Sequence, residues 1–151
     1  MKALVCLIVA VVVLAGLVQS GLAATLNFTV PAGEESVRTL NLAVEDRVLV
    51  RFTVVGQSEH VIDFSIAAPD GKTMVEYRHY GSVDYSFVCN ATGEYRLCFS
   101  NVQSLEDKFV TLDYEVQHYI FGIPQLLFLT LVIVAICLAM VAAFIFLSKL
   151  R

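Results

Sequence analysis

The chain has 151 residues, of which 58% are hydrophobic and 16% charged, and its formal net charge is −4. All 14 acidic residues and seven of the ten basic residues lie between positions 34 and 115, so this stretch carries about −7. An acidic domain is a poor binder of nucleic acid, because contacts to phosphate need a basic surface. The length allows one small domain with accessory segments.

Residues 1–24 have the three parts of a secretory signal peptide. Lys2 supplies the basic start, residues 3–18 are apolar, and the mostly small residues of SGLAA (20–24) follow. We expect cleavage after Ala23 or Ala24, with cleavage after Ser20 as an alternative. An uncleaved membrane anchor is the competing interpretation of this apolar run.

Residues 25–117 show strand periodicity nearly throughout. Apolar and polar residues alternate in RVLVRFTVV (47–55), VIDFSIAA (61–68), VDYSFVC (83–89) and EYRLCFS (94–100). This pattern indicates strands with one face on a core. In KFVTLDYEV (108–116) the apolar series does not continue in step from Phe109, which predicts a local irregularity.

Turn sequences separate these runs. They are PAG (31–33), PDGK (69–72) and NATG (90–93), which supply proline, Asx acceptors and glycines for tight turns. About eight strands with no helical period before residue 120 predict an all-β fold. We expect an antiparallel β-sandwich over residues 25–117.

A second apolar run, from Leu126 to Leu147, has 22 residues without a charge. As a helix it would span about 33 Å, enough for a bilayer. Pro124 suits a helix start, and Tyr119 and Phe121 are placed as interfacial anchors. We predict a transmembrane segment over 120–147 (core 126–147) and, because Lys149 and Arg151 follow it, a cytosolic tail over 148–151. The chain is then a single-pass type I membrane protein.

Alanine recurs every four residues within this run, at Ala135, Ala139 and Ala143. Small residues on one face let helices approach closely in lipid, so these three are candidates for helix packing. Alanine is common in membrane spans, and a coincidental spacing is an equally good interpretation.

The sequence lacks the motifs of an enzyme or a metal site. His60, His79 and His118 are far apart, and there is no nucleophile elbow, phosphate-binding loop or zinc-protease motif. We therefore expect a non-enzyme without a cofactor. Two sequons, Asn27-Phe28-Thr29 and Asn90-Ala91-Thr92, make Asn27 and Asn90 candidates for glycosylation.

Three segments carry a family resemblance: VIDFSIAAPDGK (61–72), GSVDYSFVCNATGEYRLCFSN (81–101) and DKFVTLDYEV (107–116). With the signal peptide and the C-terminal span, they resemble the GOLD-domain (Golgi-dynamics) transmembrane proteins of the early secretory pathway, the TMED-type cargo receptors. The motif residues are Pro69, Gly71, Gly93, Tyr95, Cys98, Phe99 and Asn101.

The resemblance implies a GOLD-like lumenal sandwich that binds cargo or partner proteins in vesicle transport between the endoplasmic reticulum and the Golgi. It also implies homo- or hetero-oligomers with related GOLD proteins. A different class of function is the alternative: a membrane-anchored structural or adhesion sandwich at the cell surface, with no transport role.

The chain departs from the family in three ways. It has no room for a helical segment between sandwich and membrane, and its tail, SKLR (148–151), has no aromatic pair or dilysine for a vesicle coat. The family equivalent of Cys98 pairs with a cysteine near the start of the domain, but residues 25–88 contain none.

Only Cys89 is left as a partner for Cys98, because Cys6 lies in the signal peptide and Cys137 in the span. If residues 82–89 and 94–100 form a hairpin on one core, the two sulfurs point to opposite faces. We therefore expect both cysteines to be free. A bulge would change this geometry, and an oxidising compartment favours pairing wherever geometry allows it.

Overall fold

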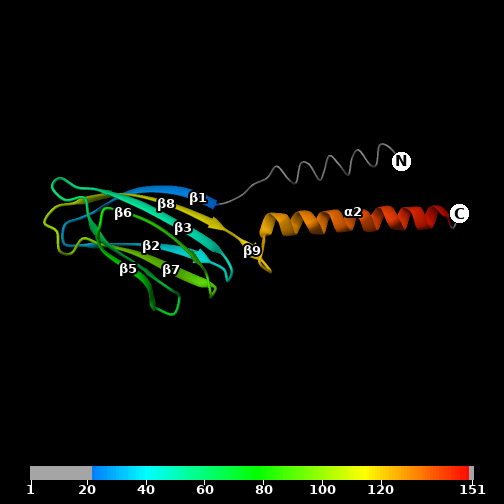
Figure 1. Cartoon of the computed structure of the whole chain (residues 1–151), viewed down its shortest axis with the longest axis horizontal. Helices are drawn as coiled ribbons and strands as arrows, with labels where there is room; N and C mark the ends of the chain where they lie inside the picture. The colour runs from blue at the N-terminus through cyan, green and yellow to red at the C-terminus, as the bar shows by residue number, and fades with distance from the viewer. Residues whose placement is uncertain (1–21, 150–151) are drawn as a thin grey trace. The chain divides into compact units, whose positions relative to one another are not determined.

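The computed structural model describes residues 22–149. The chain divides into two units, one that ends at His118 and one that begins at Tyr119. The first unit is built from strands and the second is mainly a helix (Figure 1). Each unit is described by itself below.

The first unit is an antiparallel β-sandwich, as the sequence predicts. One sheet has the order β1 (Leu22–Val30), β8 (Lys108–Gln117), β3 (Arg47–Val55) and β6 (Ser82–Val88). The other has the order β2 (Glu35–Leu42), β7 (Gly93–Ser100), β4 (Ile62–Ala67) and β5 (Thr73–Tyr80). All neighbouring strands are antiparallel.

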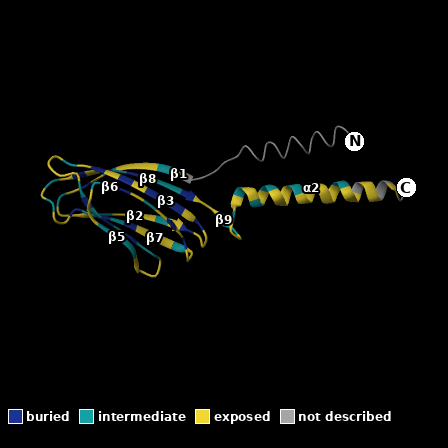
Figure 2. Cartoon of the chain, viewed as in Figure 1, coloured by how far each residue is buried: buried dark blue, intermediate teal, exposed yellow. Residues whose placement is uncertain are grey.

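The core lies between the two sheets and follows the predicted alternation. Inward positions along β3, β4 and β7 are buried, whereas their neighbours are partly or fully exposed (Figure 2). Three rings meet at the centre, with centroids 4.8 Å apart for Phe52 and Phe64, 5.4 Å for Phe52 and Phe99, and 4.9 Å for Phe64 and Phe99. Because Phe99 is fully buried, its truncation to alanine is expected to cost about 3–5 kcal/mol.

Strand β8 is regular, so the predicted irregularity after Phe109 is wrong. Its pairing with β1 and β3 runs without a register shift. Val110 and Leu112 are buried, and Phe109 lies on the outer face. The inward position at the start of the strand is occupied by Lys108, which is why the sequence pattern did not show the apolar face there.

The hairpin assumed for residues 82–100 is also wrong. Strand β6 belongs to one sheet and β7 to the other, so residues 89–92 connect the two layers. Turn sequences alone do not distinguish a hairpin from such a crossing, because both need a tight change of direction.

Strand β1 has nine residues and ends at the turn that the sequence predicts over residues 31–33. It pairs with β8 from Leu22, which lies opposite Val116, to Val30, which lies opposite Lys108. The strand therefore includes the last three residues of the predicted signal peptide. The rest of that segment, residues 1–21, lies outside the described residues.

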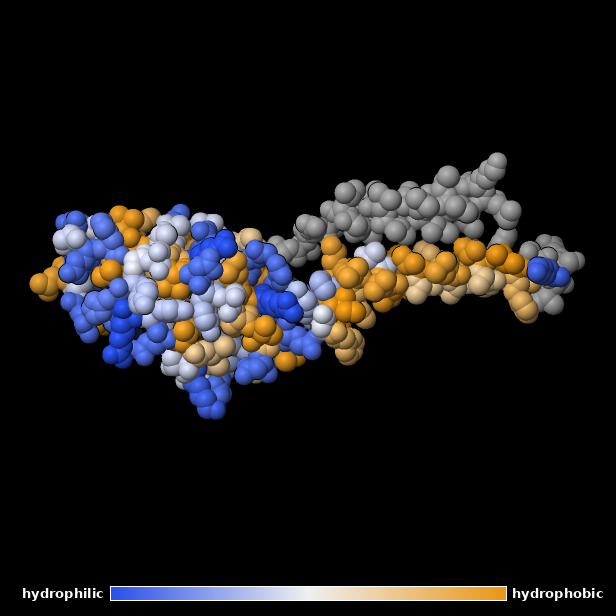
Figure 3. Space-filling view, in the orientation of Figure 1, coloured by the Kyte–Doolittle hydropathy of each residue, from blue (hydrophilic) through white to orange (hydrophobic). Residues whose placement is uncertain are grey.

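The second unit consists of a short hairpin and helix α2. The hairpin pairs β9 (Tyr119–Ile120) with β10 (Ile123–Pro124), and α2 follows over Gln125–Lys149. The helix is long and apolar enough to cross a membrane over Gln125–Ala143, and none of that window is buried. Figure 3 shows apolar side chains along the face of the helix that is in view. The helix begins directly after Pro124. Proline is favourable at a helix start because it has no backbone N–H that would be left without an acceptor.

Candidate functional site

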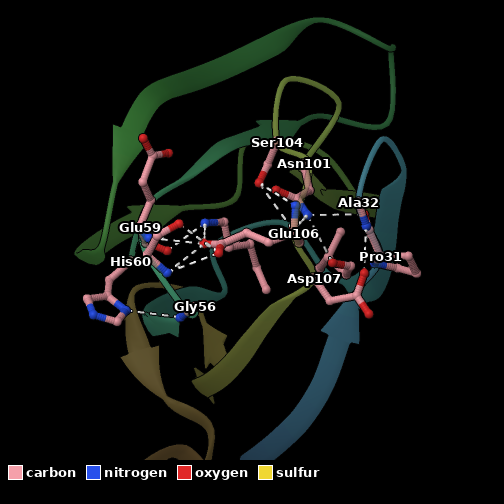
Figure 4. A network of polar contacts seen from close by, with 12 residues as sticks. Pro31, Ala32, Gly56, Glu59, His60, Asn101, Ser104, Glu106 and Asp107 are labelled. Carbon is pink, nitrogen blue, oxygen red and sulfur yellow. Dashed lines mark hydrogen bonds and ion pairs between the residues drawn. The ribbon is translucent and has the colours of Figure 1, made fainter.

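Three loops meet at one end of the sandwich and form its most elaborate polar network. They are residues 31–34, 56–61 and 101–107, which we call the loop end (Figure 4). Strand β8 begins at the loop end and leads, over ten residues, toward the helical unit. At about 3.3 Å per residue, the loop end lies roughly 30 Å from the other end of that strand.

Lys108 is the buried centre of this network. Its side chain is fully buried, and its ammonium donates to the carbonyl oxygen of Glu59 at 2.5 Å and to Oε1 of Glu106. A buried ammonium is costly unless it is paired and hydrogen-bonded. These contacts therefore fix residues 56–61 and 101–107 against each other.

Glu106 completes the link between the two loops. Its carboxylate accepts hydrogen bonds from the backbone N–H of Ser58 and Glu59, both at 3.0 Å, and from the Ser58 hydroxyl at 2.8 Å. The hydrogen bond from Lys108, followed by that from the Glu59 N–H, lowers the pKa of Glu106 to about 2. The carboxylate is therefore charged at any physiological pH.

The third loop is held by side chains on the other side of the network. The buried Asn101 amide donates to the carbonyl oxygens of Val30 and Pro31, each at 3.1 Å, and of Glu106 at 2.9 Å. The Ala32 N–H donates to Oδ1 of Asp107 at 2.9 Å. Residues 31–34 are thus tied to 101–107, and the three loops form one rigid end.

A close backbone approach explains Gly56 at the start of the middle loop. A Cβ at this position would stand 2.1 Å from the carbonyl oxygen of Glu59. The Gly56 N–H donates to Nδ1 of His60 at 3.0 Å, which closes the loop on itself. The narrow loop in turn presents Ser58 and Glu59 to Glu106.

This rigid end displays apolar side chains to solvent. Leu105 is fully exposed at 102%, and Val102 is 56% exposed in the same loop. Val55 and Phe109, opposite each other where β3 ends and β8 begins, are 58% and 46% exposed. Exposed apolar side chains that are grouped together can mark a site of protein contact, whereas single ones are common on protein surfaces. The loops themselves contain no lysine or arginine, whereas Glu34, Glu59 and Asp107 are exposed.

Motif residues Pro69 and Gly93, 24 positions apart, pack against each other. A Cβ on Gly93 would stand 2.9 Å from the Cβ of Pro69, so only glycine fits beneath the proline ring. Gly71 lies in the Pro69 turn at φ +82°, and its N–H donates to the carbonyl oxygen of Ala68. The Pro-x-Gly turn is thereby joined to the turn that precedes β7.

The remaining motif residues support the fold as well. Tyr95 is fully buried, and its hydroxyl donates to the carbonyl oxygen of Ala91 at 3.0 Å, which closes the turn before β7. Burial raises the pKa of Tyr95. Phe99 lies in the aromatic centre and Asn101 in the loop-end network. Of the motif residues, only Asn101 therefore belongs to the candidate site.

The two cysteines of the sandwich lie in different surroundings. Cys89 is buried in the core, and burial raises the pKa of its thiol to about 11. Cys98 lies on the outward face of β7, between Val37 of β2 and Ser65 of β4. Both are free thiols, and their separation follows from the crossing between sheets rather than from the hairpin assumed above.

The other candidate residues are accessible. Asn27 is exposed on β1, and Asn90 is exposed in the connection between the sheets. Ala135, Ala139 and Ala143 are exposed along α2. Within residues 22–149, no three His, Cys, Asp or Glu side chains are placed to hold a metal ion.

Sequence reasoning missed the loop-end network, although one signal was visible. The last long strand, β8, begins with Lys108 at an inward position, where an apolar residue is expected. Its partners, Glu106 and the Glu59 carbonyl, come from two loops. No periodicity relates such positions.

The solved structures give a likeness at the level of fold. PliG from Aeromonas hydrophila, a periplasmic inhibitor of g-type lysozyme, is 17% identical over 66% of this chain and 93% of its own, with a TM-score of 0.50. A mutant of the Escherichia coli PliG is 15% identical over 66% and 92%, with a TM-score of 0.45. A search of the curated proteins found no match.

The fold is thus a two-sheet antiparallel sandwich followed by one apolar helix. The family model described as emp24/gp25L/p24 family/GOLD matches residues 25–124, which cover the whole sandwich from early in β1 and the hairpin before α2. The chain belongs to the emp24/gp25L/p24 family of GOLD proteins. This membership indicates a secretory-pathway role of the cargo-receptor type.

Proposed function

We propose that the chain is a single-pass type I membrane protein that binds cargo or partner proteins in transport between the endoplasmic reticulum and the Golgi. The family match carries this proposal, and the uncovered apolar helix α2 supports it. The protein acts by binding and is not an enzyme. Residues 25–117 face the lumen, residues 120–147 anchor the chain, and residues 148–151 face the cytosol.

Protease protection tests this topology. Protease added to intact microsomes should spare the sandwich and should digest it after detergent is added. Glycosylation gives an independent readout, because Asn27 and Asn90 are exposed and would face the lumen. The variants Asn27→Gln and Asn90→Gln should each remove one endoglycosidase-sensitive step. Digestion of the sandwich in intact microsomes would refute the topology.

The loop end is the surface we assign to partner binding. The observation that carries this assignment is Leu105, fully exposed on a loop that Lys108 and Asn101 hold rigid. An ordered loop loses little conformational entropy on binding, so ordering the loop offsets little of the binding free energy gained from an apolar contact there. The exposed carboxylates nearby favour a partner with basic residues around an apolar one.

A photo-crosslinking residue at position 102, in the same loop as Leu105, tests this assignment in cells that express the full chain. We expect discrete crosslinked products, which disappear when Leu105→Asp is added. Because Leu105 is exposed, the change should alter stability by no more than about 0.5 kcal/mol. Thr39→Asp, at an exposed position of strand β2, is the matched control. Equal crosslinking in both variants would rule out the loop end.

Association within the membrane is proposed for the alanine face of α2. Ala135, Ala139 and Ala143 allow close helix contact, either between copies or with related GOLD proteins. The protein would then enter vesicles together with such partners. Ala139→Leu should reduce crosslinked oligomers without preventing membrane insertion. If removal of residues 149–151 alone stops transport while the partners stay bound, the tail is the sorting signal and this proposal is wrong.

A further inference from the structure

The hairpin before the membrane helix has an unusual turn. Ile120 lies opposite Ile123, and Tyr119 lies opposite Pro124. The two residues between them, Phe121 and Gly122, both have positive φ, at 53° and 72°. Two positive φ angles in a two-residue loop are those of a type I′ turn.

Phe121 is an unexpected residue for the first position of this turn. Asparagine, aspartate and glycine adopt positive φ most readily, and a bulky aromatic residue does so rarely. The side chain gains little protection in return, since Phe121 is 83% exposed. Its ring lies near that of Phe128 of α2, at 6.2 Å between centroids. A strained backbone with an exposed ring indicates a function outside the packing of the chain itself.

The surroundings of Phe121 identify the partner as lipid. The hairpin has no charged residue, and it continues directly into the apolar helix that begins at Gln125. Tyrosine, as at position 119, is enriched where a membrane meets water, and an exposed phenylalanine such as Phe121 suits insertion at the boundary between headgroups and acyl chains. Segments that are neither helix nor closed barrel are not exposed to the hydrocarbon interior of a membrane, so a short hairpin suits the hydrated headgroup layer.

We propose that residues 119–124 form an interfacial membrane anchor, with the Phe121 ring placed among the lipid headgroups and upper acyl chains. The type I′ turn directs the ring toward the same lipid that surrounds the first turns of α2. This inference rests on the proposed membrane span. The hairpin would contact the lipid surface directly, at the position in the chain where the helical segment of related proteins would lie between sandwich and membrane.

The chain contains no tryptophan, so a single substitution creates a unique fluorescent reporter. The test uses the full chain with Phe121→Trp, reconstituted into phosphatidylcholine vesicles with or without bromine atoms on the upper acyl chains. We expect the tryptophan to lose about half or more of its emission in brominated vesicles and to be shielded from aqueous iodide. Tyr119→Trp, in the same hairpin, should also be quenched and serves if the turn does not accept tryptophan.

Two matched variants separate the possible results. Leu131→Trp, on the exposed surface of α2 and near the upper acyl chains, should be quenched by bromine, and Leu105→Trp, at the loop end, should be quenched only by iodide. If Leu131→Trp responds to bromine but both hairpin reporters do not, the interfacial anchor is wrong and the span stands. Hairpin reporters that neither bromine nor iodide quenches would mean that protein, not lipid, covers the hairpin, which also overturns the proposal. If Leu131→Trp fails to respond, the membrane span itself is refuted and this inference with it.

Discussion

Val37 of β2 and Cys98 of β7 lie directly opposite each other on the outer face of their sheet. Farther along the same pair of strands, the Asn101 N–H donates to the carbonyl oxygen of Glu34 at 2.9 Å. Hydrogen-bonded and non-hydrogen-bonded pairs alternate along antiparallel strands, so Val37 and Cys98 form a non-hydrogen-bonded pair. Position 37 is therefore where a cysteine near the start of the domain would reach Cys98.

Val37→Cys is expected to form a disulfide with Cys98. The Cα atoms of such a pair are about 4.5 Å apart, which is within the range that a disulfide spans. The bond should stabilise the sandwich by roughly 2–4 kcal/mol relative to the reduced form. Non-reducing mass analysis and thermal unfolding with and without reductant give the measurement. Thr39→Cys, which lies opposite Arg96, is the control and should not pair.

The two thiols of the sandwich should differ sharply in reactivity. In the native protein at pH 8, a maleimide should label Cys98 and leave Cys89 unmodified, because Cys89 is buried and its pKa is raised to about 11. Only about one Cys89 thiol in a thousand is then ionised, and the thiolate is the reactive form. Peptide mapping in a Cys137→Ser background measures this. Rapid labelling of Cys89 in the folded chain, or a Cys89–Cys98 disulfide, would contradict the structure.

The loop end should keep its stability through mildly acidic pH. The pKa of Glu106 is about 2 in the folded chain, below its ordinary value of 4.5. A lowered folded pKa stabilises the fold above the unfolded pKa, and this contribution is lost as pH falls from about 4.5 toward 2. The unfolding midpoint of the wild type should therefore fall more steeply than that of Glu106→Gln below about pH 4.5. Parallel curves between pH 5 and pH 2 would show that Glu106 does not have this role.

Lys108 should be far less tolerant of substitution than its type suggests. Lys108→Met keeps the length of the side chain but removes the ammonium that the Glu59 carbonyl and the Glu106 carboxylate accept from, at a cost of about 1–3 kcal/mol. Lys72→Met, at an exposed turn, is the matched control and should have little effect. Denaturant unfolding of both variants makes the comparison.

The sandwich was predictable because apolar and polar residues alternate along its strands, and this alternation identifies the buried face of each strand. The alternation of Val48, Val50 and Phe52 requires one apolar face, and the structure buries all three. The assignment of β6 and β7 to different sheets was not predictable in this way. Alternation reports which residues face the core but not which sheet supplies them.

The candidate site was less predictable than the fold. Asn101 was recognised through the family motif, but Glu106 and Lys108 act through contacts with residues 58 and 59, nearly 50 positions earlier. Leu105 gave no signal, because a single leucine between serine and glutamate has no periodic context. Its exposure follows from the fold of residues 101–107, which Asn101 and Lys108 hold in place.

The mature chain should begin before the first strand, so that all of β1 is retained. Leu22, Ala23 and Ala24 pair with β8, so processing after Ala24 would remove three of the paired residues. The structure thus favours cleavage after Ser20, and we predict Gly21 as the N-terminal residue. Mass spectrometry of the N-terminal peptide from purified protein makes the test. A mature chain that begins at Thr25 would show that the start of β1 is dispensable.

The location of the full-length chain at its natural expression level tests the proposed function most directly. An antibody against the sandwich, combined with endoglycosidase H digestion, avoids any tag on the short tail. We predict that the protein coincides with endoplasmic reticulum and Golgi markers and that its glycans remain sensitive to the enzyme. A chain found at the plasma membrane with resistant glycans would contradict a role in early secretory transport and would support a surface-anchored sandwich instead.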